Sequence, residues 1–267
     1  MSAVVSYDTE CLLRSQSVAA RILRDIPYGT GPRQRLDIFL PSQPVHHPMP
    51  VLLFMHGGGW TIGRKEWCGF MAPPLLSLPA IFVSVGYRLI PAVAYPDPLR
   101  DCIAALAWVS DHIAAHGGDR GRIFVGGHSA GGQIAALMTL RTDLLAEAGL
   151  TAESIAGCFC LATTFNRRMI NPANAPDHVQ PEPADVIAPG SPLALANQAT
   201  RPIFIAWGTN DDPRLERTGS QMVAALRAAN CPVETLLLPG CDHFTSHLNT
   251  ASATDPWTAR VRALIAG

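Results

Sequence analysis

The sequence predicts a single α/β domain whose mostly parallel sheet carries helices on both faces. Short apolar runs of strand length alternate with longer stretches of helical periodicity, which is the pattern of parallel α/β sheets. Most of the short runs are continuous, as strands buried on both faces should be. A chain of 267 residues can build one large domain or two ordinary ones, and the alternation favours one domain over residues 1–267.

The expected strands differ in pattern mainly at the start of the chain. In the first, Leu36, Ile38 and Leu40 alternate on one side. The later strands are nearly continuous apolar runs. Strands are expected at residues 35–41, 51–56, 81–87, 122–127, 155–162, 202–208 and 233–239.

Helices are expected between these strands. The clearest begins at Asp97–Pro98, a helix-start signal, and ends at Gly117–Gly118, with apolar residues three to four positions apart. Further helices are expected over 128–141, 213–229 and 255–267. Residues 163–200 break the alternation with six prolines and little periodicity, so we predict a lid or a substrate-site insertion there.

Charge and cysteine content argue against several classes of function. The net charge is −1 and no basic run exists, so no nucleic-acid or anionic-membrane partner is expected. The seven cysteines are scattered and form no C-x-x-C pair, which predicts buried free thiols and no metal site. The chain has no apolar run of the ~18 residues that a membrane span needs, and its N-terminus lacks a signal pattern. We therefore expect a cytoplasmic protein.

The segment GGHSAGG at 126–132 contains the pattern G-x-S-x-G around Ser129. In α/β-hydrolases this pattern forms the nucleophile elbow, which requires a strand before the serine and a helix after it. Both are expected here, and side chains at positions 127 and 131 would collide with neighbouring elements. We predict that Ser129 is a nucleophile. The alternatives are a simple glycine-rich turn and a phosphate-binding loop at a helix N-terminus.

A serine nucleophile needs a base, and the base needs an orienting carboxylate, in the chain order Ser, Asp or Glu, His. His243 follows the last expected strand and is favoured among nine histidines by both order and position. Asp211 and Asp212 both follow the strand at 202–208. Asp212 stands before Pro213 and is suited to cap the next helix, which favours Asp211 as the partner of His243 and leaves Asp212 as the alternative.

The segment HGGGW at 56–60 directly follows a buried run. Glycines let a substrate oxygen approach main-chain N–H groups that side chains would block. We predict that the N–H groups of Gly58, Gly59 and Ala130 form an oxyanion hole, with His56 bracing the loop by hydrogen bonds. Trp60 is predicted to bind substrate, and core packing is the alternative for this side chain.

Five motifs together resemble the α/β-hydrolase group that includes hormone-sensitive-lipase-like esterases and kynurenine formamidases (arylformamidases). They are HGGGW, YRLIPAVAYPDPLRD, GHSAGG, GTNDDP and DHF, in family order. The segment DIPYGTGPRQRLDIFLP at 25–41 is also similar to the opening of the formamidase and small-esterase branch, so the resemblance covers roughly residues 25–245. The resemblance implies an α/β-hydrolase fold, a Ser129–Asp211–His243 triad and the oxyanion hole named above. The histidine before Ser129 is similar to the formamidase branch, whereas lipase-like relatives more often carry aspartate there.

That resemblance has one departure. Many lipase-like relatives have a long N-terminal helical cap, whereas only about 25 residues precede the segment IPYG here. We therefore expect residues 163–200 to roof part of the acyl pocket.

The leading expectation is a serine hydrolase that cleaves a small carboxylic ester or an aryl formamide through an acyl-enzyme. This chemistry needs no metal or organic cofactor. The alternative from another class is a hydrolase-fold protein that only binds a small molecule, which would be expected to lack a triad member or an oxyanion glycine. The sequence leaves open the choice between ester and formamide, and whether the chain forms a homodimer.

Overall fold

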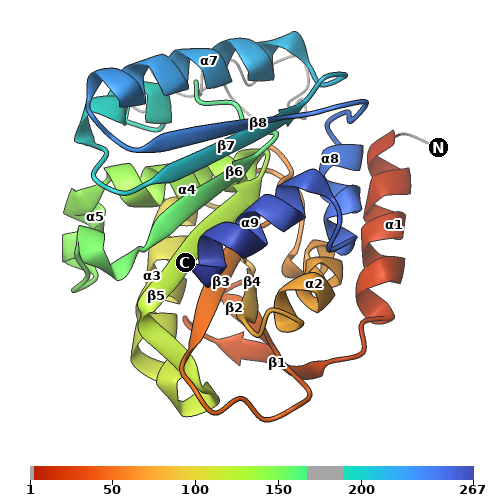
Figure 1. The fold of residues 1–267 in the computed structure, drawn as a ribbon. Helices are drawn as coiled ribbons and strands as arrows, with labels where there is room; N and C mark the ends of the chain where they lie inside the picture. Colours follow the sequence, from red (N-terminus) through yellow and green to blue (C-terminus); the bar gives the residue numbers. More distant parts are fainter. Residues whose placement is uncertain (1–2, 167–188) are drawn as a thin grey trace.

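The computed structural model describes residues 3–166 and 189–267. Within these ranges, one eight-stranded sheet runs through the centre in the order β1-β2-β4-β3-β5-β6-β7-β8 (Figure 1). Strand β2 pairs antiparallel with both β1 and β4, and all the other neighbours are parallel. The predicted single α/β domain with a mostly parallel sheet is confirmed.

The strands are Arg21–Pro27 (β1), Arg35–Leu40 (β2), Met49–Met55 (β3), Ile81–Val85 (β4), Gly118–His128 (β5), Gly157–Leu161 (β6), Ile203–Gly208 (β7) and Val233–Leu238 (β8). The α-helices are Ala3–Gln16 (α1), Ala72–Leu76 (α2), Asp97–His112 (α3), Ala130–Leu140 (α4), Thr142–Glu147 (α5), Pro213–Ala228 (α7), Thr245–Leu248 (α8) and Pro256–Ala266 (α9).

Every strand and helix expected from the sequence is present, together with several elements that the sequence pattern does not indicate. Strand β1 is an edge strand whose residues are exposed or half-buried, so it carries no buried apolar run. Helix α1 buries Tyr7, Cys11 and Ser15, while Val5 and Leu13 are exposed. The aliphatic residues of α1 therefore do not mark its buried face, although the aliphatic positions of an amphipathic helix usually do.

The two faces of the sheet carry different side chains. One face presents aliphatic residues such as Ile38 on β2 and Val51 and Leu53 on β3, in a cluster that includes α3, α4, α5 and α7. The other face presents phenylalanines, and it packs against α1, α2 and α9. Phe54 and Phe82 lie on this second face with ring centroids 6.2 Å apart. Figure 1 shows α9 in front of the sheet with α1 and α2 to one side of it.

The order of the strands creates a natural place for a site. After β3 the chain continues to β4 on one side, whereas β5 lies on the other side of β3. Open parallel sheets bind ligands at such a reversal, beyond the carboxyl ends of the strands. The glycine loop follows β3 and the elbow follows β5, so the fold brings these two segments together.

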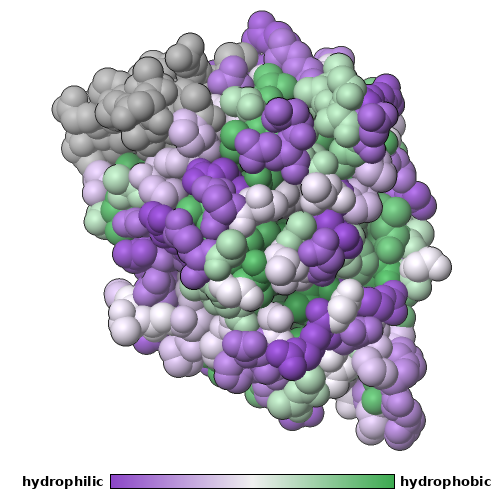
Figure 2. Space-filling model, turned by 90° about the vertical axis from the view of Figure 1, so that its left-hand side faces the viewer, coloured by the Kyte–Doolittle hydropathy of each residue, from purple (hydrophilic) through white to green (hydrophobic). Residues whose placement is uncertain are grey.

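Figure 2 shows the face at the left of Figure 1, where apolar side chains form separate small areas among hydrophilic ones. Among the described residues, no helix is both long enough and apolar enough to cross a membrane. The predicted lid or insertion at 163–200 falls largely on residues 167–188, which lie outside the described part of the chain. All seven cysteines are buried and free, as predicted.

Candidate active site

Ser129 occupies the sharp turn between β5 and α4. Its main chain has φ 55° and ψ −120°, a conformation that residues other than glycine rarely adopt. The Ser129 N–H donates to the carbonyl of Leu161 at 2.9 Å, which ties the turn to the end of β6. The strand, turn and helix expected around the G-x-S-x-G motif are therefore present.

Two glycines of the motif are required by close approach of main chain. A Cβ added to Gly127 would lie 2.1 Å from the carbonyl carbon of Gly131. A Cβ added to Gly131 would lie 2.1 Å from the carbonyl oxygen of Met55, at the end of β3. Because both contacts are to main chain, no side-chain rotation could relieve them. The collisions expected at these two positions are confirmed.

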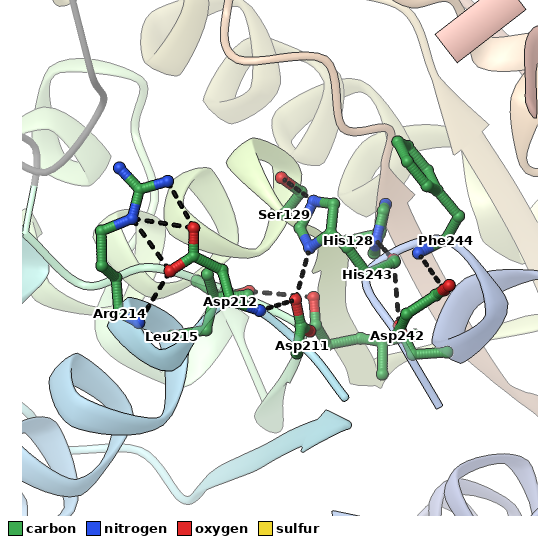
Figure 3. A network of polar contacts seen from close by, with 12 residues as sticks. His128, Ser129, Asp211, Asp212, Arg214, Leu215, Asp242, His243 and Phe244 are labelled. Carbon is green, nitrogen blue, oxygen red and sulfur yellow. Dashed lines mark hydrogen bonds and ion pairs between the residues drawn. The ribbon is translucent and has the colours of Figure 1, made fainter. Parts of the chain in front are cut away.

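Three predicted site residues come together at the carboxyl ends of β5, β7 and β8 (Figure 3). The Ser129 hydroxyl lies 2.9 Å from His243 Nε2, and His243 Nδ1 lies 3.2 Å from Asp211 Oδ1. The Asp211 side chain is 1% exposed, whereas that of His243 is 32% exposed. A hydroxyl, an imidazole and a buried carboxylate thus form a continuous hydrogen-bonded series.

Asp212 points away from His243 and into the start of α7. Its carboxylate accepts from the Arg214 main-chain N–H at 2.9 Å and pairs with the Arg214 guanidinium (Figure 3). The side-chain hydrogen bond from Arg214 holds the pKa of Asp212 below its usual range. The helix-capping role predicted for Asp212 is observed, and Asp211 is the aspartate that contacts the histidine.

The glycine loop after β3 lies against the elbow. A Cβ added to Gly57 would lie 3.1 Å from Ser129 Cβ. Gly58 and Gly59 have φ +112° and +60°, and a Cβ on Gly59 would meet no atom within 4 Å. Ala130 is the first residue of α4, where main-chain N–H groups have no partner within the helix. The structure therefore brings the loop that carries two of the predicted oxyanion donors beside the serine, and the third donor follows the serine directly.

The comparisons with known proteins concern the fold and the family. A family model described as the alpha/beta hydrolase fold matches residues 52–246, which include the glycine loop, the elbow, Asp211 and His243. The chain belongs to the α/β-hydrolase-fold family.

Relatives of this α/β-hydrolase have names from the predicted group. Kynurenine formamidase of Danio rerio is 28% identical over 239 residues, which cover 87% of this chain and 78% of that protein. Isoprenylcysteine alpha-carbonyl methylesterase of Arabidopsis thaliana is 37% identical over 135 residues, covering 51% of this chain and 31% of that protein. The chain matches only 26–31% of the length of three such plant methylesterases. The resemblance to the esterase and formamidase group is confirmed.

Solved structures confirm the α/β-hydrolase fold. The hyperthermophilic esterase from the archaeon Pyrobaculum calidifontis superposes with a TM-score of 0.76 at 20% identity, covering 100% of this chain and 93% of that one. At this level of identity the likeness concerns the fold alone.

The structure buries the side chain of Trp60. We predicted that it would bind substrate, but its side chain is 1% exposed and belongs to the hydrophobic core. Its indole N–H donates to Gln133 Oε1 of α4 at 2.8 Å. The polar end of the indole is thus satisfied inside the protein, which favours the core-packing alternative for Trp60.

Buried neutral histidines surround the site. Burial lowers the pKa of His56 to about 3 and that of His247 to about 3. Burial also lowers the pKa of His128 well below its usual value, and the neighbouring His247 and His243 act in the same direction. His56 Nδ1 lies 2.6 Å from the Gly57 carbonyl, the bracing hydrogen bond that was expected within the loop. In the described residues, no three His, Cys, Asp or Glu side chains are grouped to hold a metal ion.

One neighbour of the site has no signal in the sequence. Tyr7 of α1 is buried, and its hydroxyl lies 2.7 Å from His247 Nδ1. The aliphatic pattern does not point to Tyr7, because it stands in a helix whose aliphatic residues do not mark the buried face. The repeated histidines at 243 and 247 are a visible signal, although sequence analysis assigns a role only to His243.

Proposed function

We propose that this chain is a serine hydrolase that cleaves a small carboxylic ester or an aryl formamide. The observation that carries the proposal is the 2.9 Å contact between Ser129 Oγ and His243 Nε2, with Asp211 on the other ring nitrogen. A serine hydroxyl is a weak nucleophile until an adjacent base accepts its proton. In this arrangement His243 is the base, and Asp211 holds the imidazole in the tautomer that presents a lone pair to Ser129.

The reaction would proceed in two halves. Ser129 Oγ attacks the carbonyl carbon while its proton passes to His243 Nε2, and His243 then protonates the departing alcohol or amine. Water attacks the resulting acyl-enzyme with His243 again as base, which releases the acid and restores Ser129. The buried Asp211 carboxylate would stabilise the imidazolium that forms in each half.

The negative charge on the carbonyl oxygen would be stabilised by main-chain donors. We assign this role to the N–H groups of Gly58, Gly59 and Ala130, because the glycine loop lies against Ser129 and Ala130 begins α4. Donors fixed in advance by the fold need no reorganisation during the reaction. The removal of one such donor typically costs about 10²–10³ in kcat.

The substrate class follows from the relatives. Proteins named kynurenine formamidase match over most of this chain, and others are named esterase or methylesterase. Both sets of names describe hydrolysis at an acyl carbonyl, so we extend to this chain only the cleavage of a small ester or aryl formamide. The alternative is a protein that binds such a molecule without cleaving it.

The test compares initial rates with N-formylkynurenine and p-nitrophenyl acetate for the wild type, Ser129→Ala and Ser154→Ala. Ser129→Ala should lose activity by about 10⁴-fold or more, because the nucleophile is gone. Ser154 lies in a short turn before β6 and serves as the matched control, with unchanged rates expected. Retention of more than a few per cent of activity by Ser129→Ala would contradict the proposal.

The same experiment separates the alternatives. A far higher kcat/KM for the formamide identifies an arylformamidase, and turnover of the ester alone identifies a short-chain esterase. A non-catalytic binding protein would turn over neither substrate and would not be labelled at Ser129 by a fluorophosphonate.

A further inference from the structure

Three buried polar side chains lie behind His243, and the mechanism above does not use them. They are Tyr7 from α1, His128 from the end of β5, and His247 from α8, each at most 5% exposed. The His128 and His247 rings are stacked, with centroids 4.8 Å apart and planes inclined by 9°. Buried polar groups cost free energy unless they are hydrogen-bonded, so the partners of these three side chains determine what the cluster contributes.

The contact between His128 and His243 is to the main chain. His128 Nε2 lies 2.8 Å from the carbonyl oxygen of His243 (Figure 3). A carbonyl oxygen only accepts hydrogen bonds, so His128 must carry its proton on Nε2. Because burial keeps His128 neutral by lowering its pKa, its Nδ1 is then an acceptor. His128 therefore holds the catalytic histidine by its backbone while Asp211 holds its ring.

Helix α1 closes the cluster from the other side. The Tyr7 hydroxyl lies 2.7 Å from His247 Nδ1 and 3.4 Å from His128 Nδ1, so it faces both rings. The Tyr7 ring also packs on Phe244, the residue after His243, with centroids 4.8 Å apart. Further along α1, the Arg14 guanidinium donates to the Leu248 carbonyl at 2.8 Å. The helix thus contacts the segment that follows His243 at several points.

We propose that His128 is a positioning residue for His243, and that Tyr7 makes helix α1 part of the same support. The proposal rests on the proposed function, because it assigns His243 as the base. The base must keep its Nε2 within hydrogen-bond reach of Ser129, and a displacement of about 1 Å can cost about 10²-fold in rate. His243 stands on a loop after the edge strand β8, so contacts from other elements decide where its ring lies.

The test uses two substitutions at His128. His128→Phe keeps a flat ring of similar size but removes the Nε2 donor, whereas His128→Gln keeps a donor that can reach the same carbonyl. We expect His128→Phe to lower kcat on the order of 10–100-fold with KM changed less than about twofold. His128→Gln should recover most of that loss. The rates are expressed per Ser129 that reacts with a fluorophosphonate, which removes misfolded molecules from the comparison.

Tyr7→Phe provides a second variant that keeps the ring and loses only the hydroxyl. We expect a smaller fall in kcat, on the order of 3–10-fold, because Tyr7 acts on His243 through His128 and His247. If His128→Phe does not fold, the kcat of Tyr7→Phe tests the proposal. Tyr28→Phe is the matched control, because it also removes a tyrosine hydroxyl that donates a hydrogen bond, in this case to the Gly86 carbonyl. Tyr28 follows β1, at the edge of the sheet opposite to β8 and His243.

The outcomes distinguish a positioning role from a structural one. Variants that melt earlier but keep the wild-type kcat per reactive serine would overturn the proposal, as would a His128→Gln variant no better than His128→Phe. Ser129→Ala belongs in the same series. If it loses activity while the His128 and Tyr7 variants keep theirs, the inference fails and the proposed function stands; if it remains active, the proposed function itself has failed.

Discussion

Ser129 and His243 are held in place by different kinds of contact. At the elbow, the main chain of Ser129 bonds to Leu161 of β6, and Gly127 and Gly131 leave no room for a Cβ. On the loop after β8, His243 is held by the Asp211 carboxylate on its ring and by the His128 imidazole on its carbonyl. The nucleophile is thus placed by main-chain packing, and its partner is placed by side chains from other elements.

This difference predicts how each half of the site responds to substitution. The close main-chain packing at Gly127 and Gly131 leaves no room for an added methyl group, so such a substitution should disturb both the fold and the activity. Side-chain hydrogen bonds can be removed one at a time, so the His243 side should show graded losses in kcat. Three experiments test this contrast, from the largest expected effect to the smallest.

The largest effect is expected where a side chain touches the reacting group directly. Asp211→Asn should lower kcat by about 10³–10⁴, because an amide can donate to Nδ1 and stabilise the wrong tautomer of His243. Asp212→Asn is the matched control, since asparagine still caps a helix and Asp212 pairs with Arg214. Steady-state kinetics on both variants gives the comparison. A greater loss of kcat in Asp212→Asn than in Asp211→Asn would mean that Asp212, and not Asp211, orients His243.

A smaller effect is expected when the pH is lowered, because the buried histidines make the stability of the protein depend on pH. His56, His128 and His247 have pKa values lowered by burial, so they stay neutral in the folded protein but gain protons when it unfolds in mild acid. The unfolded state then binds more protons, and stability falls as pH falls below the ordinary histidine pKa of about 6.5. Each of the three histidines should lower the free energy of unfolding by about 1.4 kcal/mol between pH 7.5 and 5.5, and together they should lower it by roughly 4 kcal/mol.

Denaturant unfolding at pH 7.5, 6.5 and 5.5 measures this loss. His247→Gln removes one of the three groups and should reduce the pH-dependent loss by roughly a third. Equal stability at pH 7.5 and 5.5 would show that these imidazoles are not held neutral in the folded protein.

The smallest effect is expected at the elbow. Gly131→Ala should lower the free energy of unfolding by about 1–3 kcal/mol, because the added methyl group meets the Met55 carbonyl. It should lower kcat as well, since Met55 leads directly into the glycine loop. Gly121→Ala is the control on β5, where a Cβ would meet Asp119 Oδ1 at an ordinary 3.4 Å. If Gly131→Ala and Gly121→Ala have the same free energy of unfolding, main-chain packing does not fix the elbow.

The sequence by itself determined the sheet apart from its edge strand β1, the elbow and the order of the site residues. Continuous apolar runs specify strands buried on both faces, and the glycines around Ser129 and at 57–58 specify close approaches of main chain. Even the choice of Asp211 over Asp212 could be argued locally, because a helix cap depends only on the residues that follow it. These features depend on residues that are close together in the sequence, so a local pattern is enough to predict them.

Only the tertiary structure decided where helix α1 lies, that Trp60 is buried, and what holds the backbone of His243. Tyr7 and His247 are 240 positions apart, and His128 and His243 are 115 apart. Trp60 and Gln133 are 73 apart. Each of these contacts joins one polar atom to another across the fold, and no periodicity in either segment predicts the contact. Such pairings become visible only when the packing of the whole sheet has brought their elements together.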